Sequence, residues 1–164
     1  MTERSTPYDA VVAVAEPRRL LKSEVLAVCR RLEGEALGDP PAQVVATIQD
    51  VRFASANARD IWTRLAAAGT AVTVYGRDLP AYVAPGVPGV ALDDDDPLVD
   101  LWCLLVRWPD GRAAAMTASD VAGIAGIDGE AAVADERRDF DLVATEDPTV
   151  VGRCFDALRV PAGS

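Results

Sequence analysis

The stretches QVVATI at residues 43–48 and TAVTVY at residues 70–75 decide the fold. Both are short and rich in β-branched residues, and a proline precedes the first, so each predicts a buried strand. Between them, residues 52–68 place apolar side chains on one helical face, and Gly69 is the expected end of that helix. The sequence therefore predicts a β-α-β unit, whose crossover is right-handed if the two strands are parallel.

A second amphipathic helix is expected upstream of this unit. Ser23 can cap it, Glu24 suits the positive end of its dipole, and apolar residues from Val25 onward share one face. The sequence GDPP at residues 38–41 ends it. Residues 8–16 (YDAVVAVAE) fit a short strand or a weak helix, and their periodicity does not choose between the two.

Downstream, residues 76–97 are rich in proline and glycine and predict a long irregular loop with one short strand near residues 90–92. The most hydrophobic segment follows, LVDLWCLLVRW at residues 98–108, which predicts a central strand. The turn residues PDG lead into a hairpin partner at residues 112–117.

The last third predicts a loop with room for one helical turn at residues 119–136, a final strand at 138–145, and a helix opened by Asp147 and Pro148. The expected fold is α+β, with a mixed or mostly antiparallel sheet and helices packed on it. We expect a single domain at residues 17–160, an extension at 1–16 and a tail at 161–164.

Composition excludes several classes of chemistry. The 164 residues include no histidine, which rules out Ser-His-Asp and Cys-His nucleophile pairs, histidine-ligated zinc and haem, and an imidazole pH switch. Lys22 is the only lysine and lies outside any glycine-rich loop, so a Walker-type phosphate site is excluded as well. Carboxylate chemistry, binding and regulation remain, and no cofactor can be assigned.

The net charge is −10, and the arginines are scattered. A strongly acidic chain repels phosphates and anionic lipids, so we expect no direct nucleic-acid partner and no membrane partner. The three cysteines form no C-x-x-C pair and are expected to be reduced core residues. With no apolar leader at the N-terminus, a cytoplasmic protein is expected.

Several segments in order resemble one family, the DICT sensory domain of bacterial diguanylate cyclases, two-component proteins and transcriptional regulators. The similar segments, which span roughly residues 20–158, are LAVCRRLE at 26–33, the strand at 44–49 followed by Arg52-Phe53, Asp96-Pro97-Leu98 with Trp102, Arg138 with Phe140, and Thr145 with Asp147-Pro148. The chain departs from the family pattern at Cys29, Ile48 and Ala144, where serine, phenylalanine and tryptophan are usual.

The resemblance implies a stand-alone sensory module and no enzymatic activity. The chain ends six residues after Leu158, so we expect its signal to pass to a separate protein. A diguanylate cyclase, a histidine kinase or a transcription regulator would be such a partner, alongside an unidentified small ligand.

Six residues are candidates for ligand binding: Gln49, Arg52, Trp102, Arg138, Phe140 and Thr145. Gln49 ends a predicted strand at a β-α junction, where polar groups often meet ligands, although its amide could equally satisfy the following backbone. Strand alternation places Arg138 beside Phe140, where the guanidinium either flanks a cavity or covers the ring at an edge. For Trp102 a core position is the favoured interpretation.

Other charged groups favour ordinary structural roles. Arg30 and Glu33 are three residues apart on a helix and are interpreted as a surface pair, with the alternative that the arginine meets an anionic ligand. The four aspartates at residues 93–96 cannot all converge on one ion and lack an EF-hand pattern, so we expect a solvated loop and no metal site.

The leading hypothesis is a non-enzymatic cytoplasmic sensory domain that binds a small ligand or a partner protein and shifts between two states. The alternative is a protein-protein interaction module without a ligand, whose acidic surface meets a basic partner. A small carboxylate-dependent enzyme is the third hypothesis, because no catalytic constellation can be recognised in the sequence.

Overall fold

The computed structural model describes residues 5–128 and 134–158, and in it the predicted β-α-β unit is present. Strands β2 (Gln43–Asp50) and β3 (Ala71–Arg77) are parallel neighbours, joined by helix α3 (Ala56–Ala67). Gly69 follows α3 with a φ of 96°, a left-handed conformation that suits glycine at a helix end.

Helix α3 begins later than the sequence predicted. Residues 51–53 form a separate 3₁₀ turn, η1, because the Asp50 carboxylate accepts the backbone N–H of Arg52 at 3.0 Å. Ser55 then caps α3 by accepting the N–H of Ala58 at 3.1 Å. The break between η1 and α3 leaves Arg52 and Phe53 outside the helix, at the end of β2.

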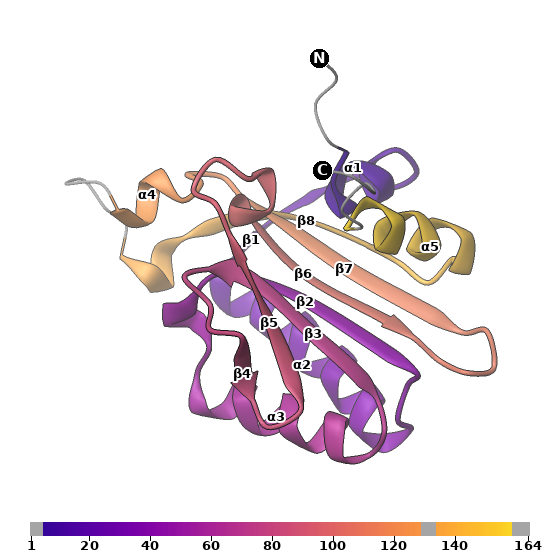
Figure 1. The fold of residues 1–164 in the computed structure, drawn as a ribbon. Coiled ribbons are helices and arrows are strands. Elements are labelled where there is room, and N and C mark those ends of the chain that lie inside the picture. Colours follow the sequence, from indigo (N-terminus) through magenta and orange to yellow (C-terminus); the bar gives the residue numbers. More distant parts are fainter. Residues whose placement is uncertain (1–4, 129–133, 159–164) are drawn as a thin grey trace, which may run out of the picture.

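The sheet has eight strands in the order β1-β8-β7-β6-β2-β3-β5-β4, which confirms the α+β class (Figure 1). The predicted central strand and its hairpin partner are β6 (Leu101–Arg107) and β7 (Ala113–Asp120), and the final strand is β8 (Asp139–Thr145). The sheet is mixed, since β2-β3 and β3-β5 are parallel pairs and the other neighbours are antiparallel. Strand β1 (Arg18–Leu21), which the sequence did not predict, pairs with β8 at one edge.

The loop expected at residues 76–97 is largely formed of strands, and the short strand predicted near residues 90–92 is part of a longer one. Strands β4 (Tyr82–Ala84) and β5 (Val87–Leu92) lie there, joined through Gly86 at a φ of 73°. Gly89 is required inside β5, because a Cβ at that position would come within 2.3 Å of the Pro80 carbonyl oxygen. The absence of a side chain at Gly89 therefore permits close packing at this edge of the sheet.

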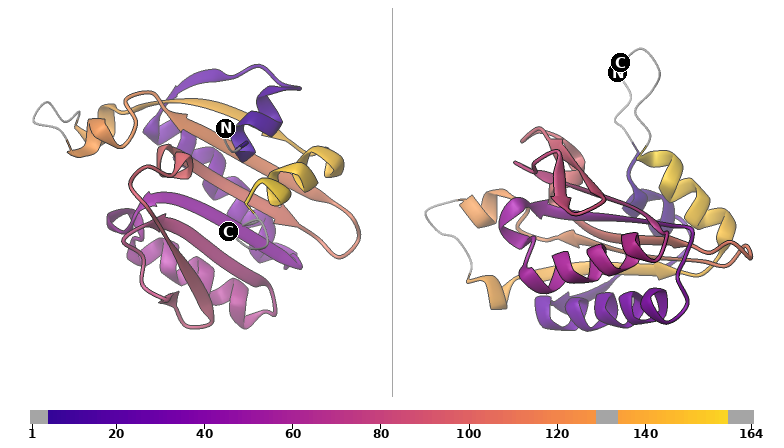
Figure 2. Two further views of the ribbon diagram at one scale, coloured as in Figure 1. Left: turned by 45° about the horizontal axis from the view of Figure 1, so that its top comes forward. Right: turned by 60° about the horizontal axis from the view of Figure 1, so that its bottom comes forward.

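Helices cover both faces of the sheet (Figure 2). Helix α2 (Lys22–Gly38) lies beside α3 on one face, and α1 (Pro7–Val12) packs against α5 (Pro148–Ala157) on the other. Each face has its own buried cluster of apolar side chains. Residues 8–16, for which the sequence allowed either a strand or a helix, contribute to α1. Val11 of this helix is fully buried in the apolar cluster that also contains residues of α5.

Three short turns complete the described chain: η2 (Pro97–Asp100), α4 (Ala125–Asp128) and η3 (Asp135–Arg137). The last two lie in or at the end of the predicted loop at 119–136, where the sequence predicted one helical turn and the described residues form two. All three cysteines are buried with free thiols. Over the described ranges no helix is long and apolar enough to cross a membrane. Residues 1–4 of the predicted extension and the predicted tail at 161–164 lie outside the described residues.

Candidate functional site

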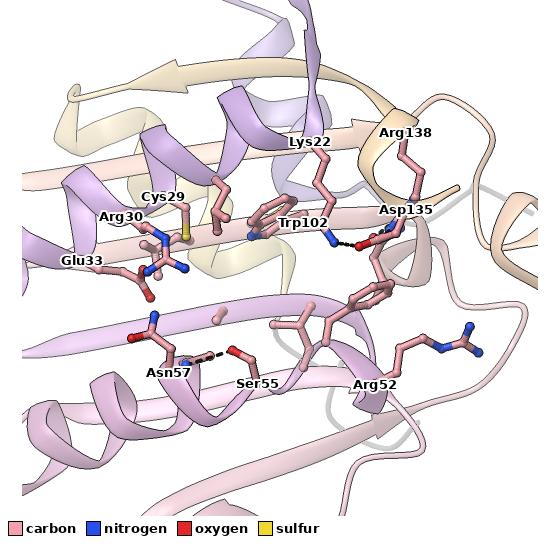
Figure 3. Close-up of a pocket in the computed structure, with 18 of the residues that line it drawn as sticks. Lys22, Cys29, Arg30, Glu33, Arg52, Ser55, Asn57, Trp102, Asp135 and Arg138 are labelled. Carbon is pink, nitrogen blue, oxygen red and sulfur yellow. Dashed lines mark hydrogen bonds and ion pairs between the residues drawn. The ribbon is translucent and has the colours of Figure 1, made fainter. Parts of the chain in front are cut away.

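A cavity of about 630 Å³ lies between helices α2 and α3 and the sheet (Figure 3). The strands beneath it are β2 and β6. Ala46 on β2 and Ala58 on α3 both face the cavity, and because they are small they leave open a volume that larger side chains would fill. The apolar part of its wall consists of Leu26, Cys29, Ala46, Ile48, Phe53, Ala58, Trp62, Trp102, Leu104 and Ile127.

Aromatic rings form much of this wall. Trp102 on β6 meets Phe140 on β8 edge to face, with ring centroids 5.6 Å apart and planes at 76°. Trp102 is half-buried and lines the cavity, whereas Trp62 of α3 is almost fully buried. The indole nitrogen of Trp102 lies on the side of the ring that faces Cys29 (Figure 3). The predicted core role of Trp102 is therefore incomplete, because part of this side chain remains available at the cavity.

At one end of the cavity five polar side chains form the Arg138 cluster: Lys22, Gln49, Asp120, Asp135 and Arg138. Arg138 is 4% exposed and donates hydrogen bonds to Gln49 Oε1 at 2.7 Å, to Asp135 Oδ1 at 3.1 Å and to the Asp120 carboxylate. Gln49 Nε2 donates to Asp120 Oδ2 at 3.0 Å, and Lys22 is ion-paired with Asp135. The cluster therefore ties the start of α2 to β2, β7 and β8.

The Arg138 cluster is balanced in charge and rests on aromatic rings. Two cations face two carboxylates within it. The Arg138 guanidinium lies 5.1 Å from the Phe53 ring centroid and 5.0 Å from that of Phe140. Burial alone would raise the pKa of Asp135, but its bonds to Lys22 and Arg138 outweigh this and hold the pKa below its usual value.

A second group of charges lies next to the cavity and involves Arg52. Arg77 on β3 donates to Asp50 Oδ2 at 2.8 Å and to Asp128 Oδ2 at 2.5 Å. Arg52 bridges the same two carboxylates, at 3.2 Å from each. Burial would raise the pKa of Asp50, but hydrogen bonds from Arg52 and Arg77 hold it below its usual range. The guanidinium of Arg77 likewise lowers the pKa of Asp128.

We call the opposite end of the cavity the Glu33 end. Its polar side chains make fewer hydrogen bonds and ion pairs with one another than those of the Arg138 cluster. Glu33 of α2 is 9% exposed, and Arg30 and Asn57 at the same end are exposed. The Glu33 carboxylate and the Asn57 amide extend toward each other across the space between α2 and α3 (Figure 3). Burial raises the pKa of Glu33, although Arg30 and the Cys29 thiol act in the opposite direction.

The six predicted site residues divide into three groups. Gln49, Arg52, Trp102 and Arg138 line the cavity. Phe140 lies behind it, in contact with Trp102 and Arg138, so the predicted neighbourhood of Arg138 and Phe140 is present. Thr145 is not brought to the cavity. It lies at the far end of β8, where its hydroxyl accepts the N–H of Asp147 at 3.1 Å beside the cap of α5.

Sequence reasoning missed the buried carboxylates of this region. Glu33 was interpreted as half of a surface pair, but its side chain is turned into the cavity while Arg30 stays exposed. Asp120, at the end of β7, gave no local signal, because its partners Gln49 and Arg138 are distant in sequence. Among the described residues, no group of three or more His, Cys, Asp or Glu side chains is placed to hold a metal ion.

No protein-family model matches the chain, and a search of curated proteins found no match. Among solved structures, the chain is similar to the crystal structure of polyphosphate kinase from Porphyromonas gingivalis, with a TM-score of 0.49 and 18% sequence identity. The match covers 80% of this chain and 22% of that protein.

Proposed function

We propose that this chain is a non-enzymatic sensory domain, and that the cavity between α2, α3 and the sheet binds its small ligand. The observation that carries the proposal is the cavity itself. At about 630 Å³ it falls within the range of small-molecule sites, and it combines an apolar wall with a few polar groups at its two ends. A pure interaction module would have a filled core and an exposed apolar patch instead.

The chemistry of the cavity favours binding over catalysis. Cys29 lines the cavity, and burial raises the pKa of its thiol, so the nucleophilic thiolate is disfavoured. The carboxylate of Asp135 and the guanidinium of Arg138 are engaged with each other. These groups can hold and orient a ligand without an evident route to a reaction.

A ligand in this cavity would act on the Arg138 cluster. Arg138 and Gln49 line the cavity, and their hydrogen bonds connect β2, β7 and the start of β8. The ion pair of Lys22 with Asp135 links the cluster to the start of α2. A ligand that contacts these residues differently in two states shifts the population between them. We propose that the state is relayed to a separate signalling protein, as the DICT resemblance implies, and that any effect on DNA is indirect because the net charge is −10.

Thermal shift of the whole chain against a metabolite library tests ligand binding. A ligand at about 100 times its Kd adds roughly 2.7 kcal/mol to the free energy of unfolding. Ala58→Phe fills the cavity and should abolish the shift, whereas Ala67→Phe on the exposed side of the same helix should retain it.

Two results would overturn the proposal. If no compound shifts the transition while a basic protein partner binds, the chain is an interaction module. If the purified chain turns over a substrate and one acidic substitution abolishes turnover, it is an enzyme.

A further inference from the structure

We propose that the Glu33 end of the cavity is a binding site for a protonated amine, so that the ligand is a small amine with an apolar body. This inference rests on the proposed function and specifies the ligand class. It follows from the position of the Glu33 carboxylate, from the pairing of the other charged side chains around the cavity, and from the arrangement of the apolar wall.

Glu33 differs from Asp135, the carboxylate at the other end of the cavity, in its burial and in its partners. Its side chain is 9% exposed and faces the cavity from the middle of α2. Across residues 5–128 and 134–158, no arginine or lysine nitrogen comes within 4 Å of it, whereas Asp135 at the other end has both Lys22 and Arg138. The neighbouring thiol of Cys29 acts to lower the pKa of Glu33, but a thiol is a weak hydrogen-bond donor.

A buried carboxylate without a cation is costly unless it is neutralised. Two events can neutralise Glu33: uptake of a proton, or entry of a cation. The raised pKa of Glu33 has burial as its largest cause, so the attraction of Arg30 does not compensate for the loss of water. A protonated amine that entered from the cavity would provide both the positive charge and strong hydrogen-bond donors.

For an anionic ligand, most cations of the cavity wall are already paired. Lys22, Arg52 and Arg138 are each paired with aspartate. Arg30 is the remaining cation of the cavity wall, and an anion bound to it would lie next to the Glu33 carboxylate. Charge complementarity at this end therefore favours a cation.

The rest of the ligand would lie on apolar side chains. Leu26 and Ile48 line the cavity together with the rings of Trp62 and Trp102. Aromatic faces also attract an ammonium group directly. A ligand with an amine at one end and an aromatic or aliphatic body matches this distribution, with the amine at Glu33 and the body over the sheet.

Three probes of similar shape and different charge test the inference on the whole chain: 2-phenylethylamine, 2-phenylethanol and 3-phenylpropionate. Binding is measured by calorimetry and by the indole N–H shifts of Trp62 and Trp102. We expect the amine to bind at least tenfold more tightly than the alcohol or the acid. Glu33→Gln should remove this preference, and Glu35→Gln, at an exposed position of the same helix, should keep it.

The remaining outcomes separate the two proposals. If the alcohol or the acid binds best, or if the preference persists in Glu33→Gln, the amine site is wrong while a ligand-binding cavity stands. If none of the three probes binds but a library compound without an amine does so in a manner blocked by Ala58→Phe, the amine site is again wrong. If no compound binds at all, both proposals fail.

Discussion

The guanidinium of Arg138 donates a hydrogen bond of 2.7 Å to the side-chain oxygen of Gln49, 89 residues away in the sequence. The contact joins the segment before β8 to the end of β2 at the edge of the cavity. Both residues also bond Asp120, whose side chain is 1% exposed. One buried triangle of side chains thus joins β2, β7 and the segment before β8 where the proposed ligand would bind.

Removal of the Arg138 side chain should destabilise the fold strongly. Arg138→Met leaves the Asp120 carboxylate buried with only neutral donors, and loss of one partner of a buried ion pair costs about 3–5 kcal/mol. Urea denaturation measures the change. Arg19→Met removes an exposed pair with Asp141 and should cost less than about 1 kcal/mol. Equal losses in the two variants would show that the Arg138 cluster does not hold the strands together.

Gln49 adopts an unusual backbone conformation, with a φ of 72°. Left-handed backbone is unfavourable for a residue with a Cβ by about 1 kcal/mol and is free of that penalty for glycine. Gln49→Gly and Gln49→Ala lose the same hydrogen bonds, so the glycine variant should be the more stable by about 1 kcal/mol in urea denaturation.

The opposite order is expected at an ordinary strand position. Ala71 is exposed on β3 and has no positive φ. Ala71→Gly should destabilise the protein by roughly 0.5–1 kcal/mol. If glycine is the worse residue at both positions, the strain at Gln49 is negligible.

The parts of the fold that the sequence predicted are those with a local pattern. Helix α5 has its cap, its proline and its apolar face within residues 147–158, and β2 and β3 are compact β-branched runs. Strands β4 and β5 lack such a pattern. Their proline and glycine resemble a loop, and they are strands because β5 pairs with β3 and β4 pairs with β5. The four-residue β1 likewise depends on its pairing with β8.

The same distinction applies to the site. Gln49 and Arg138 could be identified because they lie at strand ends, where polar side chains meet. Glu33 could not, because the sequence shows only its spacing from Arg30. Which of the two faces inward depends on how α2 packs against α3 and the sheet, and that packing is set by residues remote from both.

Acid should destabilise the protein partly through the contacts of Arg77. The pKa values of Asp50 and Asp128 are lowered in the folded state from a usual value of 3.8. A carboxylate with a lowered pKa contributes stability that is complete above its unfolded pKa and is lost as the pH falls through the folded one. The free energy of unfolding should therefore decrease below about pH 4.

Arg77→Met tests this assignment. Without the guanidinium the two folded pKa values rise toward the unfolded value, so the variant should be less stable at pH 7 and its stability should depend less on pH below 4. Urea denaturation at a series of pH values measures both. A variant whose acid dependence matches that of the wild type would show that other carboxylates carry it.

At one buried hydroxyl, a substitution should stabilise the fold. Thr117 on β7 is fully buried, and within the described part of the chain its Oγ1 has no hydrogen-bond partner. Thr47 on β2 is equally buried, but its hydroxyl donates to the Leu101 carbonyl at 2.9 Å and accepts the N–H of Cys103 at 3.0 Å. The two threonines therefore differ in the hydrogen bonding of their hydroxyl groups and not in their exposure to solvent.

Valine has nearly the shape of threonine without its hydroxyl. Thr117→Val should stabilise the fold by about 1–3 kcal/mol, because it removes an unsatisfied buried polar group. Thr47→Val should destabilise it by a similar amount, since it leaves the N–H of Cys103 without its acceptor. Thermal and urea denaturation of the two variants measure the difference. If Thr117→Val is also destabilising, the hydroxyl of Thr117 has a partner, such as a buried water, that holds it in place.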